Sequence, residues 1–337
     1  MRAKIIIILI GTLLLFSTTS FGQIPEELSI TSDFRLRYEI NDVDGKENLK
    51  DRQRIRFRFG MKYKTETIEM GGRLATNSGN LQSPHQTLGT LDGSSNKDFG
   101  LDRAYLTMKF NTETSVTLGK AALNYWQQNE VLFDNDLSPE GISASYRLPV
   151  SEAELTLNSG YYILKEENDA EGIFQDDNLL MLQGVFTTGS TVFKSTSSVG
   201  YGKIIEAGVV DGVFEERKVF SVAQQFSNFF DLPLTAGFDY ITSDADDENS
   251  AFIIMLKGKY QDFGWGIWYY DVAENSTLYS GFSQDNWPAS VGFSGVRLQF
   301  DFKLVDNVKS DFRIYQQNMD SGIDDTIRYQ LNINFTI

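Results

Sequence analysis

Apolar and polar residues alternate along most of this chain, and this alternation limits the folds open to it more than any other feature. From Ile30 to Ile40, from Arg54 to Lys64 and from Ile327 to Ile337, nearly every second side chain is apolar, and the residues between are charged or polar. Alternation at 180° per residue is typical of a strand with one apolar and one polar face. No long stretch has the 3.6-residue period of a helix.

Sixteen segments of this kind are predicted to be strands. They cover residues 29–40, 52–64, 68–76, 101–110, 115–121, 141–148, 152–164, 178–186, 190–202, 217–228, 233–242, 250–261, 264–272, 290–304, 308–317 and 325–337. The connections between them alternate in length, since every odd-numbered one has seven residues or more and every even-numbered one has four or fewer.

This alternation of connection lengths indicates a membrane protein. Transmembrane barrels have short turns at the periplasmic rim and long loops at the other rim, and a spanning sheet must close on itself because lipid leaves no partner for backbone N–H and C=O groups. We therefore predict an all-β fold, a transmembrane antiparallel up-and-down β-barrel of about 16 strands, with 14 to 18 also compatible. The soluble alternative is a secreted β-sandwich that binds glycans.

The first 22 residues have the parts of an export signal. Arg2 and Lys4 are basic, the twelve residues from Ile5 to Phe16 are almost all apolar, and a small polar region ends at Gly22. Twelve residues fall short of the roughly 20 that a membrane-spanning helix needs. We expect a cleavable signal peptide over residues 1–22, a single barrel domain over residues 23–337, and a location in the outer membrane of a Gram-negative cell.

Composition excludes several function classes. The chain has no Cys and one His, so it has no disulfide framework, no cysteine nucleophile and no multi-His metal site of its own. Its net charge of −16 argues against nucleic acid as a partner. A hydrolase would need a nucleophile, a base and an orienting group, and His85, beside Pro84, is expected to be a solvated loop residue. No catalytic residue, metal or cofactor is predicted.

The inward face of the barrel is expected to be basic. If the polar face of every strand points inward, the lumen wall carries 19 basic and eight acidic residues, whereas the loops hold most of the acidic ones. Neighbouring strands are roughly 4.8 Å apart, so the arginines near the two chain ends form a predicted basic ladder along the pore. The predicted pore-lining residues are Arg35, Arg37, Arg54, Arg56, Arg58, Arg73, Arg103, Arg313 and Arg328.

Loop 122–140 is the predicted constriction. It contains no cation and four carboxylates that would face the arginines if the loop folds into the barrel, namely Glu130, Asp134, Asp136 and Glu140. Opposite charges across a narrow passage would produce a transverse field that favours polar solutes. Alternatively, Asp134 and Asp136 only cap a turn or bind a divalent ion.

Five short motifs occur in order over about residues 50–150. They are Gly72–Thr76, Gln86–Gly89, Leu101–Leu106, Leu118–Lys120 and Asp134–Gly141. As an ordered set they resemble the putative porin family of Gram-negative outer membranes. The resemblance implies an outer-membrane diffusion channel without enzyme activity.

These observations together predict a porin for small hydrophilic solutes, with an arginine-lined lumen and a mild anion preference. The alternatives are a substrate-specific anion channel, for phosphate or acidic sugars, and a non-conducting structural or adhesive barrel. Expected partners are outer-membrane lipid and lipopolysaccharide, the barrel-assembly machinery and small polar solutes. The oligomeric state is left open, a homotrimer being one arrangement.

Overall fold

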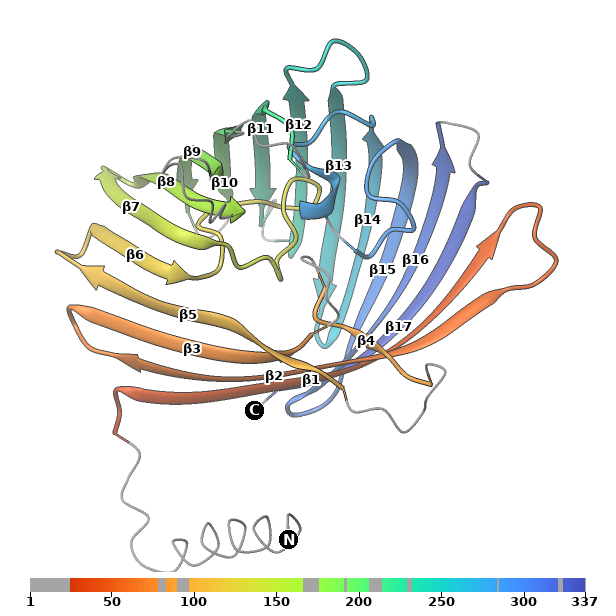
Figure 1. Cartoon of the computed structure of the whole chain (residues 1–337), viewed down its shortest axis with the longest axis horizontal. Coiled ribbons are helices and arrows are strands. Elements are labelled where there is room, and N and C mark those ends of the chain that lie inside the picture. The colour runs from red at the N-terminus through yellow and green to blue at the C-terminus, as the bar shows by residue number, and fades with distance from the viewer. Residues whose placement is uncertain are drawn as a thin grey trace, which may run out of the picture.

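A computed structural model of the chain shows a closed antiparallel β-barrel (Figure 1). It describes residues 25–77, 83–89, 97–165, 176–190, 193–205, 214–228, 232–283, 285–320 and 324–336. The predicted signal peptide and the last residue lie outside these ranges. The helix in the described part, a single 3-10 turn named η3 (Ser280–Phe282), is far too short to cross a membrane.

Sixteen long strands and one short strand make up the sheet. They are β1 (Leu28–Val43), β2 (Lys50–Lys64), β3 (Ile68–Thr76), β4 (Gln86–Thr87), β5 (Phe99–Lys109), β6 (Thr114–Lys120), β7 (Glu140–Val150), β8 (Ala153–Lys165), β9 (Asp177–Gly189), β10 (Lys194–Ile205), β11 (Arg217–Ser227), β12 (Leu234–Ser243), β13 (Ser250–Tyr260), β14 (Phe263–Val272), β15 (Phe293–Val305), β16 (Val308–Met319) and β17 (Thr326–Thr336). The prediction of a transmembrane antiparallel barrel of about 16 strands is confirmed, and each predicted segment overlaps one long strand.

Three local features differ from the prediction. The connection 228–233 is as long as the loops 44–49 and 244–249, so the predicted gap between short and long connections is wrong there. Some long strands, such as β1 and β9, extend beyond the predicted ends, because backbone pairing continues where the apolar alternation stops. The short strand β4 was not predicted. It pairs with β2 at Arg54 and Ile55, whereas β3 pairs with β2 from Arg58 onwards.

The barrel closes where β1 pairs with β17, and polar side chains join the two strands on the inner face. Four pairs of directly opposed residues form side-chain hydrogen bonds across this seam. The bonds are Arg35 Nε to Asn334 Oδ1 at 2.5 Å, Arg37 Nε to Asn332 Oδ1 at 2.8 Å, Gln330 Nε2 to Glu39 Oε1 at 3.0 Å, and Arg328 Nε to Asn41 Oδ1 at 2.8 Å. Because the side-chain period of a strand is two, these bonds and the outward apolar residues specify the same register.

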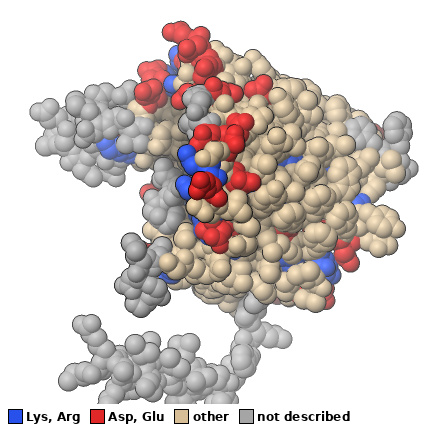
Figure 2. Space-filling model, turned by 90° about the vertical axis from the view of Figure 1, so that its right-hand side faces the viewer, with Lys and Arg blue, Asp and Glu red and all other residues tan. Residues whose placement is uncertain are grey.

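The outer face of the wall is apolar. On β1 and β3, for example, Leu36 and Leu74 are exposed while the arginines beside them in sequence point inward. Figure 2 shows a broad surface with few charged side chains on one side of the molecule, with acidic residues gathered at its upper edge and acidic and basic residues along one column. Such a surface suits contact with lipid acyl chains, since charge on the lipid face is costly.

Two loops, 121–139 and 273–292, fold into the interior, and we call them the inner loops. Their apolar residues pack against inward-facing residues of β9 to β16, and this is the hydrophobic core of the protein. The most deeply buried members include Val131, Phe133, Phe282, Trp287, Tyr270, Phe293 and Tyr315. We call the inward surface of β9 to β14 the apolar wall.

The premise that every strand turns its polar face inward is therefore wrong for part of the barrel. On β13, Ile253 and Met255 are buried inside, and on β14 so are Trp268 and Tyr270. These strands are apolar on both faces, so alternation could not reveal which face meets lipid and which meets the inner loops. The polar inward face that was predicted is found mainly on β1 to β5, β16 and β17.

Candidate functional site

The register of β1 and β2 brings four arginines together on the inner face. Arg35 lies opposite Arg56, and Arg37 lies opposite Arg54. Directly opposed side chains in an antiparallel pair have Cβ atoms about 5 Å apart, and like charges at that distance are destabilising. These four residues, which we call the arginine square, therefore require carboxylates or other acceptors nearby. The inner face of β1, β2, β3, β5, β16 and β17, which bears the nine predicted arginines, is called the arginine wall.

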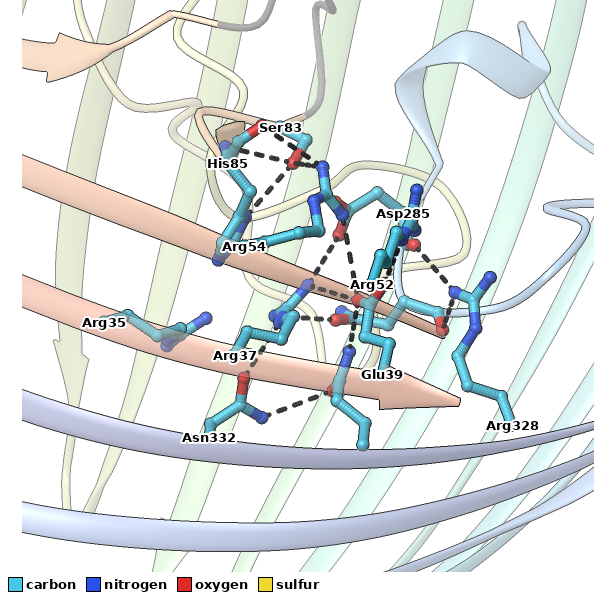
Figure 3. A network of polar contacts seen from close by, with 12 residues as sticks. Arg35, Arg37, Glu39, Arg52, Arg54, Ser83, His85, Asp285, Arg328 and Asn332 are labelled. Carbon is cyan, nitrogen blue, oxygen red and sulfur yellow. Dashed lines mark hydrogen bonds and ion pairs between the residues drawn. The ribbon is translucent and has the colours of Figure 1, made fainter. Parts of the chain in front are cut away.

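One carboxylate cluster lies at the Arg37–Arg54 edge of the square (Figure 3). Glu39, which is 1% exposed, approaches Arg37 Nη1 at 3.4 Å and Arg54 Nη1 at 3.8 Å, and it also pairs with Arg52. Asp285, from the second inner loop, is 3.3 Å from Arg54 Nη1 and 3.9 Å from Arg37 Nη1. One strand residue and one loop residue thus neutralise this pair of arginines.

A second carboxylate cluster lies at Arg56 and Arg58. Asp33 of β1 contacts Arg56 Nη2 at 3.0 Å and Arg58 Nε at 2.6 Å. Asp136, from the first inner loop, contacts Arg56 Nη1 at 3.0 Å and Arg58 Nη1 at 2.6 Å. Asp136 therefore ties its loop to the arginine wall through two guanidinium groups, and charge-assisted hydrogen bonds of this kind are stronger than neutral ones.

The two inner loops share one design. In each, a buried phenylalanine on the apolar side is followed three residues later by the carboxylate that reaches the arginine wall: Phe133 and Asp136 in the first, Phe282 and Asp285 in the second. The loops also bind each other, because the Asp134 backbone N–H donates to the Phe282 carbonyl at 2.6 Å and the two phenylalanine rings lie 6.3 Å apart. They form one plug that spans the lumen.

Two carboxyl groups of the first inner loop have opposite electrostatic environments. Burial raises the pKa of Asp134 well above its usual range, and the nearby carboxylates of Glu130, Asp136 and Asp285 raise it further. Burial would also raise the pKa of Asp136, but attraction to the guanidinium groups of Arg56 and Arg58 outweighs it and lowers the pKa. Asp136 is therefore the charged anchor, and Asp134 is the group that resists ionisation.

Four other predicted pore residues have partners on the same strand, on a neighbouring strand or on the inner loops. Arg73 pairs with Asp102, Arg103 Nε donates to Ser138 Oγ at 3.3 Å, and Arg313 Nε is 2.6 Å from Asp311. Arg328 donates to the Asn286 backbone carbonyl at 2.7 Å, so it also contacts the second inner loop.

The other two predicted loop carboxylates lie away from the arginine square. Glu130 accepts a hydrogen bond from Asn286 at 3.1 Å, which adds a contact between the inner loops. Glu140 is the first residue of β7 and pairs with Lys120 at 3.1 Å. A cavity of about 440 Å³ lies beside Asp136 and is also lined by Asp102, Lys120 and Glu140.

Three contributors were not identified from the sequence. Asp285 belongs to the long connection 273–289, whose length was the only signal that it contributes to the interior. Ser83 and His85 lie in the segment before β4, and the expectation that His85 is solvated is wrong, since it is 2% exposed. Packing of this segment against Arg54 buries it, because Arg54 Nη2 donates to Ser83 Oγ at 3.1 Å and to the His85 carbonyl at 3.3 Å.

Comparison with known proteins gives the same fold. The protein superposes on OprB of Pseudomonas putida with a TM-score of 0.64 at 10% sequence identity. The match covers 96% of this chain and 97% of the OprB chain. A mutant porin of Rhodopseudomonas blastica matches with a TM-score of 0.56 at 11% identity, over 92% of this chain and 100% of that one. No curated protein sequence matches significantly.

A match to a sequence-family model shows which family the chain belongs to. The model described as "Putative porin" matches residues 21–194, which is more than half of the chain. This range contains β1 to β9 together with the first inner loop and Asp136. The chain, a transmembrane β-barrel and a channel protein rather than an enzyme, therefore belongs to the putative porin family.

Proposed function

We propose that this porin conducts small hydrophilic solutes by passive diffusion across the outer membrane, along an arginine-lined path with a mild preference for anions. The observation that carries the proposal is the one-sided interior. The inner loops bury their apolar residues against the apolar wall, so the charged boundary of any water-filled path is the arginine wall.

The preference is expected to be mild because most of the guanidinium groups already have carboxylate partners. Arg37, Arg54, Arg56 and Arg58 share Glu39, Asp285, Asp33 and Asp136. The exposed acidic loops act at a distance and are screened beyond roughly 8 Å at physiological salt. The wall is closer to a permeating ion, and low-dielectric surroundings strengthen its field.

The test is a reversal-potential measurement in planar bilayers with a KCl gradient. We expect ohmic currents and an anion preference that weakens as salt rises. Cation preference at low salt would show that the acidic loops dominate instead. Absence of current from a folded barrel would favour the structural or adhesive alternative.

The proposal includes export and assembly. Residues 1–22 act as a cleavable signal peptide, and the mature chain starts near Gln23. The barrel is inserted by the barrel-assembly machinery and contacts outer-membrane lipid and lipopolysaccharide, as a monomer or a homotrimer. N-terminal sequencing of the protein from outer-membrane fractions, with electrophoresis before and after heating, tests this part, and recovery as a soluble periplasmic protein would contradict it.

A further inference from the structure

His85 is held over the arginine square by a hydrogen-bond arrangement that fixes its tautomer. Ser83 Oγ accepts from Arg54 Nη2 at 3.1 Å and from the His85 backbone N–H at 3.3 Å. Its own hydroxyl proton is then directed to His85 Nδ1, which is 3.1 Å away. A neutral imidazole that accepts at Nδ1 carries its proton at Nε2, so His85 Nε2 is an N–H donor.

The imidazole is neutral because of its surroundings. Burial lowers the pKa of His85 well below its usual value, and the nearby charges of Arg37, Arg56, Arg35 and Arg54 lower it further. All four residues of the arginine square thus act on this one ring. In the view of Figure 3, the His85 side chain extends from its segment toward β1 and β2, with Arg35 below it.

Several donors around this point have no acceptor. Within the described part of the chain, the buried atoms His85 Nε2, Arg54 Nε and Arg56 Nε make no hydrogen bond. Arg35 has no carboxylate within ion-pair distance among the residues that the structure describes, and its Nε donates to the neutral side chain of Asn334. Buried donors without acceptors are costly, more so in charged groups, and Arg35 is only partly buried, so solutes in the lumen can approach it.

We infer that His85 and the arginine square form a binding site for a small oxyanion, such as phosphate or a carboxylate, on the solute path. An oxyanion supplies several acceptor oxygens and the negative charge that Arg35 lacks, and arginine binds such groups with two parallel N–H donors. A cation would be repelled by Arg35, which no carboxylate neutralises among the described residues, and a neutral solute would leave Arg35 without a counter-charge. The inference deepens the proposed function in that the anion reaches the site through the lumen.

The first experiment measures binding without current. Inorganic phosphate is titrated calorimetrically into the folded, detergent-solubilised barrel, with chloride at equal ionic strength as the reference. We expect saturable binding of phosphate. Arg35→Gln and His85→Leu should weaken it about tenfold or more, and Arg35→Lys, which keeps the charge, should weaken it less than Arg35→Gln.

Arg147→Gln is the matched control. It removes the same charge from an exposed position on β7, where Arg147 Nη2 donates to the Thr112 carbonyl at 2.6 Å, and phosphate binding should stay within twofold of the wild type. Electrophoretic mobility before and after heating verifies that each variant is folded. If His85→Leu does not fold, Arg35→Gln decides the question.

The outcomes separate this inference from the proposed function. Absence of saturable phosphate binding to the folded wild type, or equal binding by the wild type and by Arg35→Gln, overturns the site, whether or not the barrel conducts. Saturable block of chloride current by phosphate, weakened in Arg35→Gln, supports both. Phosphate binding by a barrel that carries no current would keep the site and overturn the diffusion pore.

Discussion

The two sides of the barrel interior bury their side chains in different ways. On the apolar wall, side chains such as Tyr270 and Ile253 are buried by contact with Phe133, Trp287 and their neighbours. On the arginine wall, the buried side chains are charged, and Arg37 and Arg56 are only 3% and 5% exposed. The first side needs only apolar partners, whereas the second needs specific hydrogen-bond acceptors, most of them carboxylates, at its guanidinium groups.

The difference assigns separate tasks to the two ends of each inner loop. Apolar contact is non-directional and roughly proportional to area, so it supplies most of the energy that keeps the loops inside. The ion pairs of Asp136 and Asp285 have defined geometry, and removal of one partner leaves a buried charge uncompensated. We conclude that the apolar wall retains the plug and the arginine wall positions it.

The largest expected effect comes from removing the apolar anchors. Phe133→Ala combined with Phe282→Ala deletes two fully buried rings, and each such change typically costs about 3–5 kcal/mol. The inner loops should leave the apolar wall, and single-channel conductance should rise severalfold. Phe186→Ala, on the lipid-facing side of β9, is the control and should leave conductance unchanged. Unchanged conductance in the double variant would mean that the ion pairs alone hold the plug.

Reversing charge on the arginine wall should change selectivity more than structure. Arg56→Glu with Arg58→Glu places two carboxylates beside Asp33 and Asp136 and should weaken the contact of the first inner loop. The backbone pairing of β1 with β2 does not depend on these side chains, so the barrel should assemble while the reversal potential shifts toward cations. Lys257→Glu with Lys259→Glu makes the same charge change on β13, away from the arginine wall. This pair should shift the reversal potential less than half as far. An equal shift from both pairs would locate the filter away from the arginine square, and failure to assemble would show that the arginines belong to a packed core.

A smaller, pH-dependent effect is expected from Asp134. Its raised pKa means that the docked loop holds a proton which a free carboxyl, titrating near 4, would release. Docking is therefore most stable at acid pH and loses stability as the pH rises through the raised pKa. Conductance should increase in the wild type as the pH rises from the free-carboxyl value of about 4 through the raised pKa of Asp134. In Asp134→Asn, which keeps an acceptor for the Asp136 N–H, the increase should be absent, and a persisting increase would assign the effect to another group.

The smallest effect is expected at the rim, which belongs to neither wall. Lys46 and Asp324 form a 2.9 Å ion pair between two loops, with both side chains about half exposed. Exposed pairs of this kind contribute little because solvent screens them. Lys46→Gln should leave the unfolding temperature, the conductance and the selectivity within experimental error. A clear change in selectivity would show that rim charges influence permeation.

Much of the fold could be predicted because lipid imposes a strict rule on the outer face. Each spanning strand must present apolar residues every second position, and β17 does so without interruption. β1 departs from the pattern only at Ser32 and Asp42. Even the short β6 could be found from this rule. Strand ends could not, since backbone pairing at the rims does not depend on side-chain polarity.

The candidate site could be predicted only in part. The inward orientation of the arginine square could be predicted, because an arginine on a spanning strand has to face inward. The partners of these arginines could not be predicted, because Asp285 and His85 reach them from loops whose path depends on tertiary contacts with the apolar wall. On β13 and β14, both faces are apolar, so no pattern in the sequence distinguishes lipid from loop.

The polar seam between β1 and β17 has a consequence for the order of assembly. The two strands are separated by nearly the whole chain, so their pairing is the last and entropically most costly step of closure. All four seam bonds involve a charged arginine or glutamate, and such bonds are worth about 1.5–3 kcal/mol each. A slip of two residues would keep the apolar face in lipid and yet separate all four bonded pairs. The side-chain pairs of the seam therefore favour the native register over a slipped closure that the lipid-facing residues alone would permit.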